Sequence, residues 1–350
     1  MEGAPARVPL PARAIVPVLG GVAFVLAAVA VGLLVGPVSV GAGEIARSAA
    51  SHLPFLDVAS PLTPAEEAIV WELRAPRVVL GLLVGGMLAI AGGAYQGVFR
   101  NPLVDPYLLG VAAGAGLGAT LAITYAGSAV DRYELLPLAA FAGAALGVAM
   151  AYVLGQAASG GRSPAALVLA GVTVVAFLTA VQTFVQQQHT DSLQQVYSWI
   201  LGRLNTSGWH EVWLVAPYIL VASAVLLLHR RVLDVLSVGD DEAATLGVNV
   251  KRVRLVVVAF ATVGTAAAVA VSGLIGFVGI IVPHAIRLAI GSSYRLVLPL
   301  SLLVGGGFLV LADVLARTVV APAELPIGVV TAAFGAPFFA MLLRTTRSFT

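Results

Sequence analysis

Cysteine is absent from the 350 residues of this sequence, and charged residues make up only 10% of it. Without cysteine the chain forms neither disulfides nor cysteine-ligated metal sites, and we expect no metal site and no cofactor. Lysine occurs once, as Lys251, among 19 lysines and arginines. That lysine follows Val250 instead of a glycine, so the GxxxxGK[ST] phosphate loop of ATPases is missing. The net charge of +2 is too small to indicate a nucleic-acid partner.

Acidic residues are scarce in the apolar stretches, where an ion-coupled transporter needs them. Of 17 acidic residues, all but Asp313 and Glu324 fall in predicted loops or at the chain start, and these two lie near the outer ends of their helices. No nucleophile triad, metal cluster or pair of catalytic carboxylates can be assembled from the rest. An ion-coupled secondary transporter and a membrane-embedded enzyme are therefore the weaker hypotheses, and the simplest energy source is a separate ATPase subunit.

Apolar residues, by contrast, make up 59% of the sequence, which also contains 38 glycines. Several apolar runs exceed the roughly 18 to 20 residues that cross a bilayer as a helix. Small residues four apart, as in Gly81/Gly85, Gly110/Gly114 and Gly114/Gly118, permit close helix packing in lipid. We therefore predict an all-α integral membrane protein, a single domain over residues 1–350 with about ten transmembrane helices in a tightly packed, Gly- and Ala-rich bundle. The predicted spans are 14–35, 77–99, 107–125, 135–156, 165–187, 212–228, 253–272, 274–290, 296–316 and 326–343.

The arginines orient the chain in the cell membrane. An even number of spans places both termini on one side, and with the termini in the cytoplasm most cations fall in cytoplasmic loops, as the positive-inside rule requires. The polar segment 37–72 then becomes an extracytoplasmic loop with surface helices. The arginines left outside are Arg47, Arg74, Arg77, Arg132, Arg203 and Arg317.

The segment 229–252 is the longest polar interruption between two apolar runs, and it carries both charge signs. Its cationic flanks indicate a cytoplasmic loop. Asp240 and Asp241 can cap a short helix there, and Gly247 is well placed to end it. A surface helix held by two spans is a part that a soluble partner could push, although an ordinary solvated loop fits the composition equally well.

Three of the outer arginines stand in short motifs at span ends, Arg74 and Arg77 in RAPR and Arg317 in DVLAR. Because the motifs lie on the same side, all three arginines can face outward at one surface. We expect them to have few acidic partners, with Asp313 four residues before Arg317 and Glu72 close to RAPR. The alternative is that each is a membrane-interface arginine whose side chain reaches the headgroups.

The fifth span carries a group of uncharged polar side chains at helical spacing. These residues are Thr179, Gln182, Thr183 and Gln186. On a helix they define one hydroxyl-and-amide face, which can line a pathway for a bulky hydrated solute because conduction requires weak binding sites. The alternative is that they form hydrogen bonds to neighbouring helices.

Five stretches of the sequence resemble one family in its own order and spacing, from about Arg74 to the C-terminus. The family is that of the FecCD-type permeases, the membrane subunits of type II ABC importers, and the branch closest in look carries cobalamin. The stretches are RAPRVVLGLLVGGMLAIAGGAYQGVFRNPLVDPYLLG (74–110), EAATLGV (242–248), SGLIGFVGIIVPHAIR (272–287), LADVLAR (311–317) and AELPIGVVTAAFGAPFFAMLL (323–343).

The resemblance implies a type II ABC importer permease fold and a set of partners. Two copies of the chain would form a homodimer around the translocation path, with two ATPase subunits beneath and an extracytoplasmic substrate-binding protein above. Arg74, Arg77 and Arg317 match the positions that receive acidic residues of the binding protein. The implied cargo is a large metal chelate, cobalamin first, with iron-siderophore or haem as the alternative. The residues implied to couple transport to the ATPase are Asp240, Asp241, Glu242, Ala243, Ala244 and Gly247.

Overall fold

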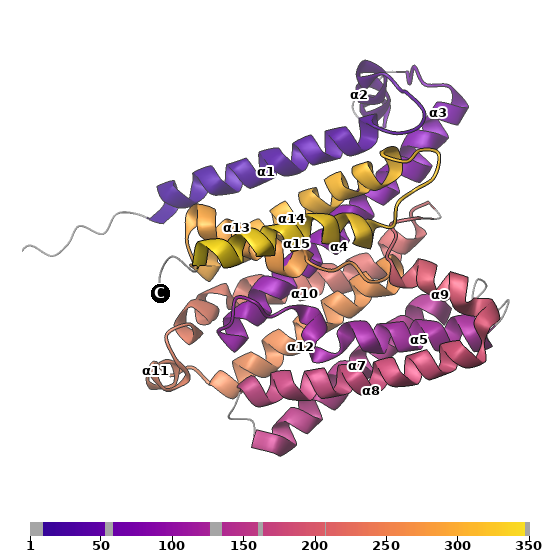
Figure 1. Cartoon of the computed structure of the whole chain (residues 1–350). Coiled ribbons are helices and arrows are strands. Elements are labelled where there is room, and N and C mark those ends of the chain that lie inside the picture. The colour runs from indigo at the N-terminus through magenta and orange to yellow at the C-terminus, as the bar shows by residue number, and fades with distance from the viewer. Residues whose placement is uncertain (1–9, 53–58, 127–134, 160–163, 207, 347–350) are drawn as a thin grey trace, which may run out of the picture.

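The computed structural model describes residues 10–346 except 53–58, 127–134, 160–163 and 207, and this part of the chain is helical without strands. Within these residues, seven long and three shorter apolar helices form the bundle, in agreement with the ten spans that the sequence predicted. Figure 1 shows how they are arranged. Arg132 and Arg162 lie outside the described residues. The seven long helices are α1 (Leu10–Leu34), α4 (Ala75–Phe99), α7 (Leu135–Ser159), α8 (Pro164–Gln188), α10 (His210–Leu236), α12 (Val250–Ser272) and α14 (Tyr294–Thr318). The three shorter ones are α5 (Val111–Tyr125), α13 (Val278–Ile290) and α15 (Ile327–Thr346).

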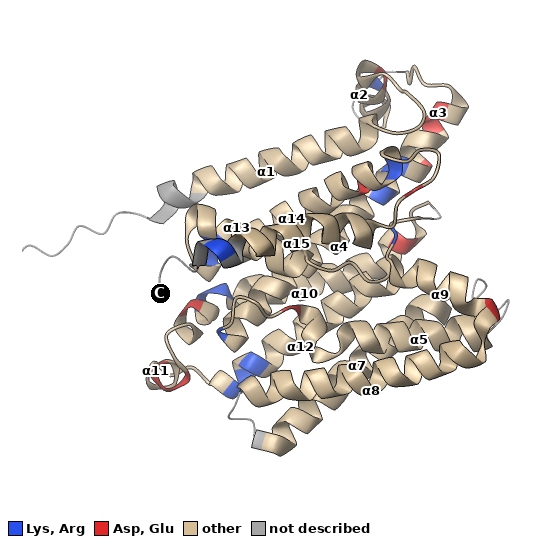
Figure 2. Cartoon of the chain, in the orientation of Figure 1, with Lys and Arg blue, Asp and Glu red and all other residues tan. Residues whose placement is uncertain are grey.

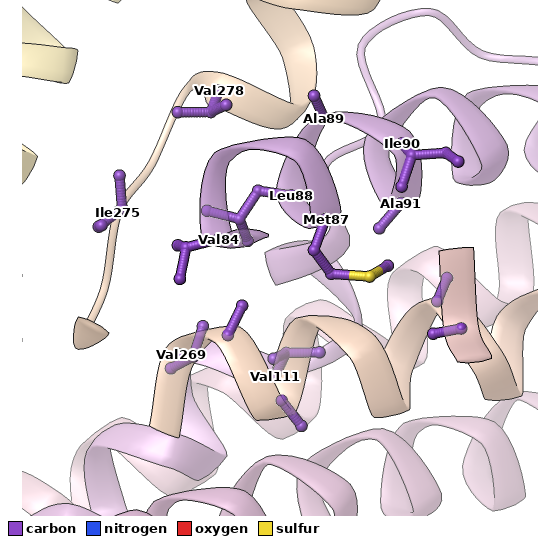
Figure 3. Close-up of a cluster of buried hydrophobic side chains, with 14 of the residues drawn as sticks. Val84, Met87, Leu88, Ala89, Ile90, Ala91, Val111, Val269, Ile275 and Val278 are labelled. Atoms are coloured by element: carbon purple, nitrogen blue, oxygen red, sulfur yellow. The ribbon is translucent and has the colours of Figure 1, made fainter. Parts of the chain in front are cut away.

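Helix α4 is the centre of the bundle, and it packs against α10, α12, α13 and α14. Almost all of its side chains are buried, whereas most of α1 is exposed on the outside of the bundle. Figure 3 shows Val84, Met87 and Leu88 of α4 lying among side chains from other segments, including Val269 of α12 and Ile275. A helix that is apolar all round is suited to this position, because every face has a protein neighbour.

Glycines hold the central helices at short distances. A Cβ atom added to Gly85 would lie 2.3 Å from the carbonyl oxygen of Gly305 in α14, and one added to Gly114 would lie 2.1 Å from that of Gly143 in α7. These separations leave no room for any side chain. The prediction of close packing through the small-residue pairs is thus confirmed at α4–α14 and at α5–α7.

Two spans begin later than predicted because irregular backbone precedes them. Residues Pro106–Leu109 form a 3₁₀ turn, η2, before α5, and the partly buried segment 273–277 precedes α13. The hydroxyl of Tyr107 in η2 ties the two segments together, since it donates to the carbonyl of Ile275 at 3.1 Å and accepts from the Ile275 amide at 3.1 Å. Irregular backbone inside a bundle needs such partners for its polar groups.

This arrangement also places one acidic residue of a predicted loop among the helices. Asp105 is half-buried, and its carboxylate accepts a hydrogen bond from the amide of Tyr107 at 2.7 Å. The η2 turn that Asp105 opens packs against α4, α5, α7, α8 and α12. A carboxylate therefore lies among the helices, satisfied by its own backbone turn.

Short helical elements lie at the two ends of the bundle. At one end lie α2 (Ala42–Ser51), α3 (Pro64–Ala68), the π-helical turn η1 (Ile69–Arg74) and α9 (Leu193–Ile200), and we call it the α3 end. At the opposite end lies α11 (Asp240–Thr245), and we call it the α11 end. The prediction of surface helices within 37–72 is confirmed. Figure 2 shows the charged residues gathered mainly at these two ends.

Candidate functional site

The α3 end contains a cavity of about 410 Å³ that brings the three motif arginines together. Arg74 and Arg77 come from the junction of η1 with α4, and Arg317 comes from the last turn of α14. Glu324, in the loop between α14 and α15, lies on the same wall. The prediction that RAPR and DVLAR meet at one surface is confirmed in this respect, although they are separated by more than 230 residues in the chain.

Arg77 binds two carboxylates with different parts of its guanidinium group. Its Nε donates to both carboxylate oxygens of Asp313 at 3.0 Å, and its Nη2 donates to Asp313 Oδ1 at 2.8 Å. Its Nη1 and Nη2 donate to the two oxygens of Glu324 at 2.9 Å each. Paired N–H donors in one plane match the two oxygens of a carboxylate, which is why arginine suits this position.

Arg74 and Arg317 instead bind the end of α1. The last carbonyl groups of a helix lack amide partners within the helix and carry partial negative charge. Arg74 Nη1 donates to the Leu33 carbonyl at 2.8 Å, and Arg317 Nη2 donates to that of Gly32. Arg317 also lies 3.8 Å from Asp313. The two guanidinium groups therefore fasten α1 to α4 and α14.

The expectation that these arginines face outward was wrong, and the expectation of few acidic partners was wrong for Arg77. Arg74 and Arg317 are buried, and the side chain of Arg77 is only 14% exposed. The physical reason is that α1 supplies carbonyl groups, while Asp313 and Glu324 supply two carboxylates to Arg77. Glu324 is the residue that sequence reasoning missed, and its signal was an acid in the AELPIG motif on the same side as RAPR.

The Glu324 carboxylate is the accessible part of this cluster, because its side chain is 42% exposed. Hydrogen bonds from the Arg77 guanidinium hold the pKa of the Glu324 carboxyl below its usual range. Glu324 is therefore ionised at neutral pH. The cavity thus presents one half-exposed carboxylate, which is bound to Arg77.

The α11 end carries the second candidate site, a short surface helix packed against α10 and α12. The predicted helix exists as α11, and Gly247 ends it with a positive φ of 83°. The prediction that Asp240 and Asp241 cap its N-terminus was wrong, because Gly239 is the N-cap residue and no side chain caps it. Asp240 turns back to the bundle instead, where it pairs with Arg254 at 3.0 Å.

Asp240 also connects this turn to the central helix. Its carboxylate lies 3.5 Å from the guanidinium of Arg100, the residue that ends α4 in a left-handed conformation. Ala243 is fully buried against the bundle, so α11 is anchored through its first acid and one small side chain. Its remaining polar residues, Asp241 and Glu242, are exposed.

Two large apolar residues flank α11 and project into the surroundings. Val238 is 71% exposed before the helix, and Leu246 is 72% exposed at its end. Ala244 between them is exposed as well. Exposed apolar groups beside charged ones mark a contact surface for another protein. Sequence reasoning missed Val238 and Leu246; their signal was apolar character inside an otherwise polar interruption.

The polar residues of α8 do not share one face. Thr179 and Thr183 are exposed, and the Thr183 hydroxyl donates to the Thr179 carbonyl of its own helix at 2.9 Å. Gln182 is buried against α5, where a Cβ atom on Gly116 would lie 2.9 Å from its Oε1 atom. Gln186 is half-buried. The single-face prediction was therefore wrong for Gln182, because the small Gly116 admits its amide between the helices.

In the part of the chain that the structure describes, ten apolar helices carry an anchored turn at one end and a charged cavity at the other, the architecture of a multi-span membrane protein. The chain belongs to the FecCD transport family, whose model matches residues 12–345. It is therefore the permease subunit of an ABC importer, a multi-pass membrane protein whose family implies a separate ATPase and a substrate-binding protein.

Named relatives carry different cargoes. The chain is 45% identical over 279 residues to a cobalamin import system permease of Halobacterium salinarum, covering 79% of this chain and 74% of the relative. It is 38% identical to an Fe(3+)-citrate import permease of Bacillus subtilis, covering 89% and 90% of the two chains. It is 39% identical to a hemin transport permease of Yersinia pestis, covering 79% and 84%.

The fold is also that of a solved permease. A chain from an inward-facing conformation of an ABC transporter superposes with a TM-score of 0.81 at 29% identity, covering 94% of this chain and 98% of the other. The predicted type II ABC importer permease fold is confirmed.

Proposed function

We propose that this chain is the permease half of an importer that carries a large metal chelate, cobalamin in the first place, into the cell. Two copies form the path, two ATPase subunits bind at the α11 turns, and an extracytoplasmic binding protein docks at the α3 end. The observation that carries this proposal is the convergence of Arg74, Arg77 and Arg317 on one cavity, at the end opposite the exposed α11 turn. Both termini and α11 then lie in the cytoplasm, in agreement with the positive-inside distribution of arginine.

The cargo is tested with purified transporter in proteoliposomes, together with its ATPase subunits and binding protein. We expect ATP-dependent accumulation of cobalamin, because the cobalamin permease shares the highest identity of the relatives named above. Haemin and ferric siderophores are the matched competitors, since iron-chelate permeases are related at 38–39% identity. Uptake of an iron chelate without cobalamin would assign the alternative cargo. Uptake driven by an ion gradient without ATP would refute the importer.

Docking at the α3 end is assigned to the cavity that Arg74, Arg77 and Arg317 line. Acidic residues of the binding protein meet Arg77 there, while Arg74 and Arg317 add positive charge and hold α1 in place. Arginine keeps its charge and binds carboxylates through two parallel hydrogen bonds. Exposed ion pairs contribute about 0–1 kcal/mol each, so a few of them give a partner that can dock and leave. Arg74→Glu with Arg77→Glu should weaken docking steeply, and more at low than at high ionic strength.

Coupling is assigned to α11 and its flanks, from Asp240 to Gly247. Asp240 and the buried Ala243 fix the turn to the permease. Glu242 and Ala244 are exposed and available to an ATPase subunit. An ATPase that moves the turn then moves the ends of α4 and α12, to which Asp240 is paired through Arg100 and Arg254.

The translocation path is assigned to α8, where the structure distinguishes two kinds of polar residue. Thr179 and Thr183 are exposed, while Gln182 is buried against α5. On this cysteine-free background, Thr183→Cys should react with an aqueous maleimide during turnover, and Gln182→Cys should react far more slowly. Protection of Thr183→Cys and Thr179→Cys in every transport state would remove α8 from the path. Gln186→Cys, half-buried in the described structure, should react at an intermediate rate.

A further inference from the structure

The guanidinium of Arg77 is nearly saturated by residues of its own chain. Arginine has five N–H donors. The Nε donor and one Nη2 donor are directed to Asp313, and one donor from each of Nη1 and Nη2 is directed to Glu324. Only one Nη1 donor is left over. A carboxylate from another protein can therefore form at most a single hydrogen bond with Arg77 while both acids remain in place.

The two acids differ in how firmly they are held. Asp313 lies inside α14, its side chain is only 4% exposed, and it also faces Arg317 at 3.8 Å. Glu324 lies in the loop between α14 and α15, and its side chain is 42% exposed. The neighbouring Leu325 amide fixes the loop by donating to the Ala316 carbonyl at 2.8 Å. The loop backbone is thus anchored while the Glu324 side chain is free to swing into solvent.

The other two arginines are less accessible to an incoming carboxylate than Arg77 is. Arg74 donates to Leu33 and Val38 carbonyls, and Arg317 donates to Gly32. Withdrawing either guanidinium would leave helix-end carbonyls without partners in a buried place, which is costly. Within the cavity, the Glu324 position on Arg77 is the one that can be vacated by rotating a single exposed side chain.

We propose that Glu324 is a built-in surrogate for the binding protein, and that docking exchanges it for a carboxylate of that protein on the same two N–H donors of Arg77. The inference rests on the docking role proposed above for the cavity. The exchange replaces one two-bond carboxylate contact by another, so its net free energy is small. Glu324 therefore keeps the Arg77 charge neutralised between docking events, and it sets how acidic a partner must be to bind.

If Glu324 occupies the place of a partner carboxylate, removing its charge should raise the affinity of the permease for an acidic binding protein. Glu324→Gln keeps the size of the side chain but loses its charge, so Arg77 becomes available. The full transporter, with its ATPase subunits, is placed in lipid nanodiscs and titrated with its purified cognate binding protein. We expect the Kd to fall about two- to fivefold, the range of one exposed ion pair. Glu324→Asp, which keeps the charge but is one methylene shorter, should give a smaller decrease.

Glu72→Gln is the matched control. Glu72 is exposed at the same end but lines a different cavity, so its removal changes the net charge equally without freeing Arg77. An equal decrease in Kd for both variants would reduce the effect to general charge and overturn the inference. An unchanged or higher Kd for Glu324→Gln would overturn it too, because Glu324 would then only orient Arg77.

Arg77→Gln separates this inference from the docking proposal. A marked rise in Kd for Arg77→Gln together with no decrease for Glu324→Gln would retain the docking cavity and reject the surrogate. An unchanged Kd for Arg77→Gln would reject the docking cavity itself. With both ideas correct, the double variant Arg77→Gln with Glu324→Gln should bind as weakly as Arg77→Gln alone, since the freed position no longer exists.

Discussion

The two ends of this permease differ in which side chains they bury and which they expose. At the α3 end, charges are gathered and hidden, and Arg77 is enclosed by Asp313 and Glu324. At the α11 end, apolar side chains are displayed, with Leu246 72% exposed. Ionic contacts are weak, fast to form and sensitive to salt, whereas buried apolar area gives durable contacts. With the proposed function, we expect a partner that comes and goes at the α3 end and a more stably bound partner at the α11 end.

The largest expected effect is a loss of stability when the buried ion pairs at the α3 end are disrupted. Asp313→Ala removes the carboxylate that both Arg77 and Arg317 face, so that buried Arg317 loses its carboxylate and Arg77 keeps Glu324 alone. Loss of one partner of a buried ion pair costs about 3–5 kcal/mol. We expect a clear drop in the thermal unfolding temperature of the purified protein. Glu324→Ala, at an exposed position on the same guanidinium, should lower it far less; equal drops would contradict the difference in burial.

The next effect breaks the α11 end. Gly247→Pro forces φ to about −65°, where the chain requires 83°, and deletes an amide that donates to the Ala244 carbonyl at 2.9 Å. The strain of about 3 kcal/mol distorts the turn, so ATP hydrolysis should lose its link to transport. Uptake and hydrolysis are measured together in proteoliposomes.

A matched glycine controls for backbone strain alone. Gly208, at φ 72°, is likewise surrounded by open space, but it lies toward the α3 end. Gly208→Pro should leave the ratio of transport to hydrolysis intact. A normal ratio in Gly247→Pro, or a loss in both variants, would count against α11 as the coupling element.

A smaller effect is expected from removing an exposed apolar side chain at the α11 end. Leu246→Ala should weaken association with the ATPase subunits, because fully burying a leucine side chain contributes about 1.5–3 kcal/mol, or roughly 10- to 100-fold in affinity. The readout is the fraction of ATPase retained on the purified permease at increasing detergent wash volumes. Val319→Ala, an exposed apolar residue at the other end, is the control, and similar retention in the two variants would speak against a contact at Leu246.

The smallest effect concerns pH at the α3 end. Because Arg77 lowers the pKa of the Glu324 carboxyl in the folded state, the stability that Glu324 adds is present above its unfolded pKa. That stability is lost as the pH falls through the lowered folded value. The unfolding temperatures of the parent and Glu324→Gln should differ by a constant small amount between about pH 8 and pH 5, and converge in more acidic buffer. A gap that widens on acidification would contradict this pairing.

The sequence was sufficient for the number and nature of the spans because apolar run length and glycine spacing are local properties. It was also sufficient to bring RAPR and DVLAR to one end, since span parity decides which side a motif occupies. It could not reveal that α1 offers its final carbonyls to Arg74 and Arg317, because helix-end partners depend on which helices become neighbours. The burial of the Gln182 side chain likewise depends on Gly116 in the neighbouring helix α5. The sequence of α8 alone does not contain this information.

Helix α4 gives these separate observations a common consequence. It is one uninterrupted α-helix of 25 residues, about 37 Å long at 1.5 Å per residue. Arg77 stands near its first turn and Arg100 at its last, each paired to a different end of the molecule. If a partner at one end changes the preferred position of this rod, thermodynamic reciprocity requires that a partner at the other end changes the affinity of the first by the same factor. If α4 couples the two ends in this way, ATPase binding at the α11 end changes the affinity for the binding protein at the α3 end. Docking of the binding protein then changes the affinity for the ATPase by the same factor.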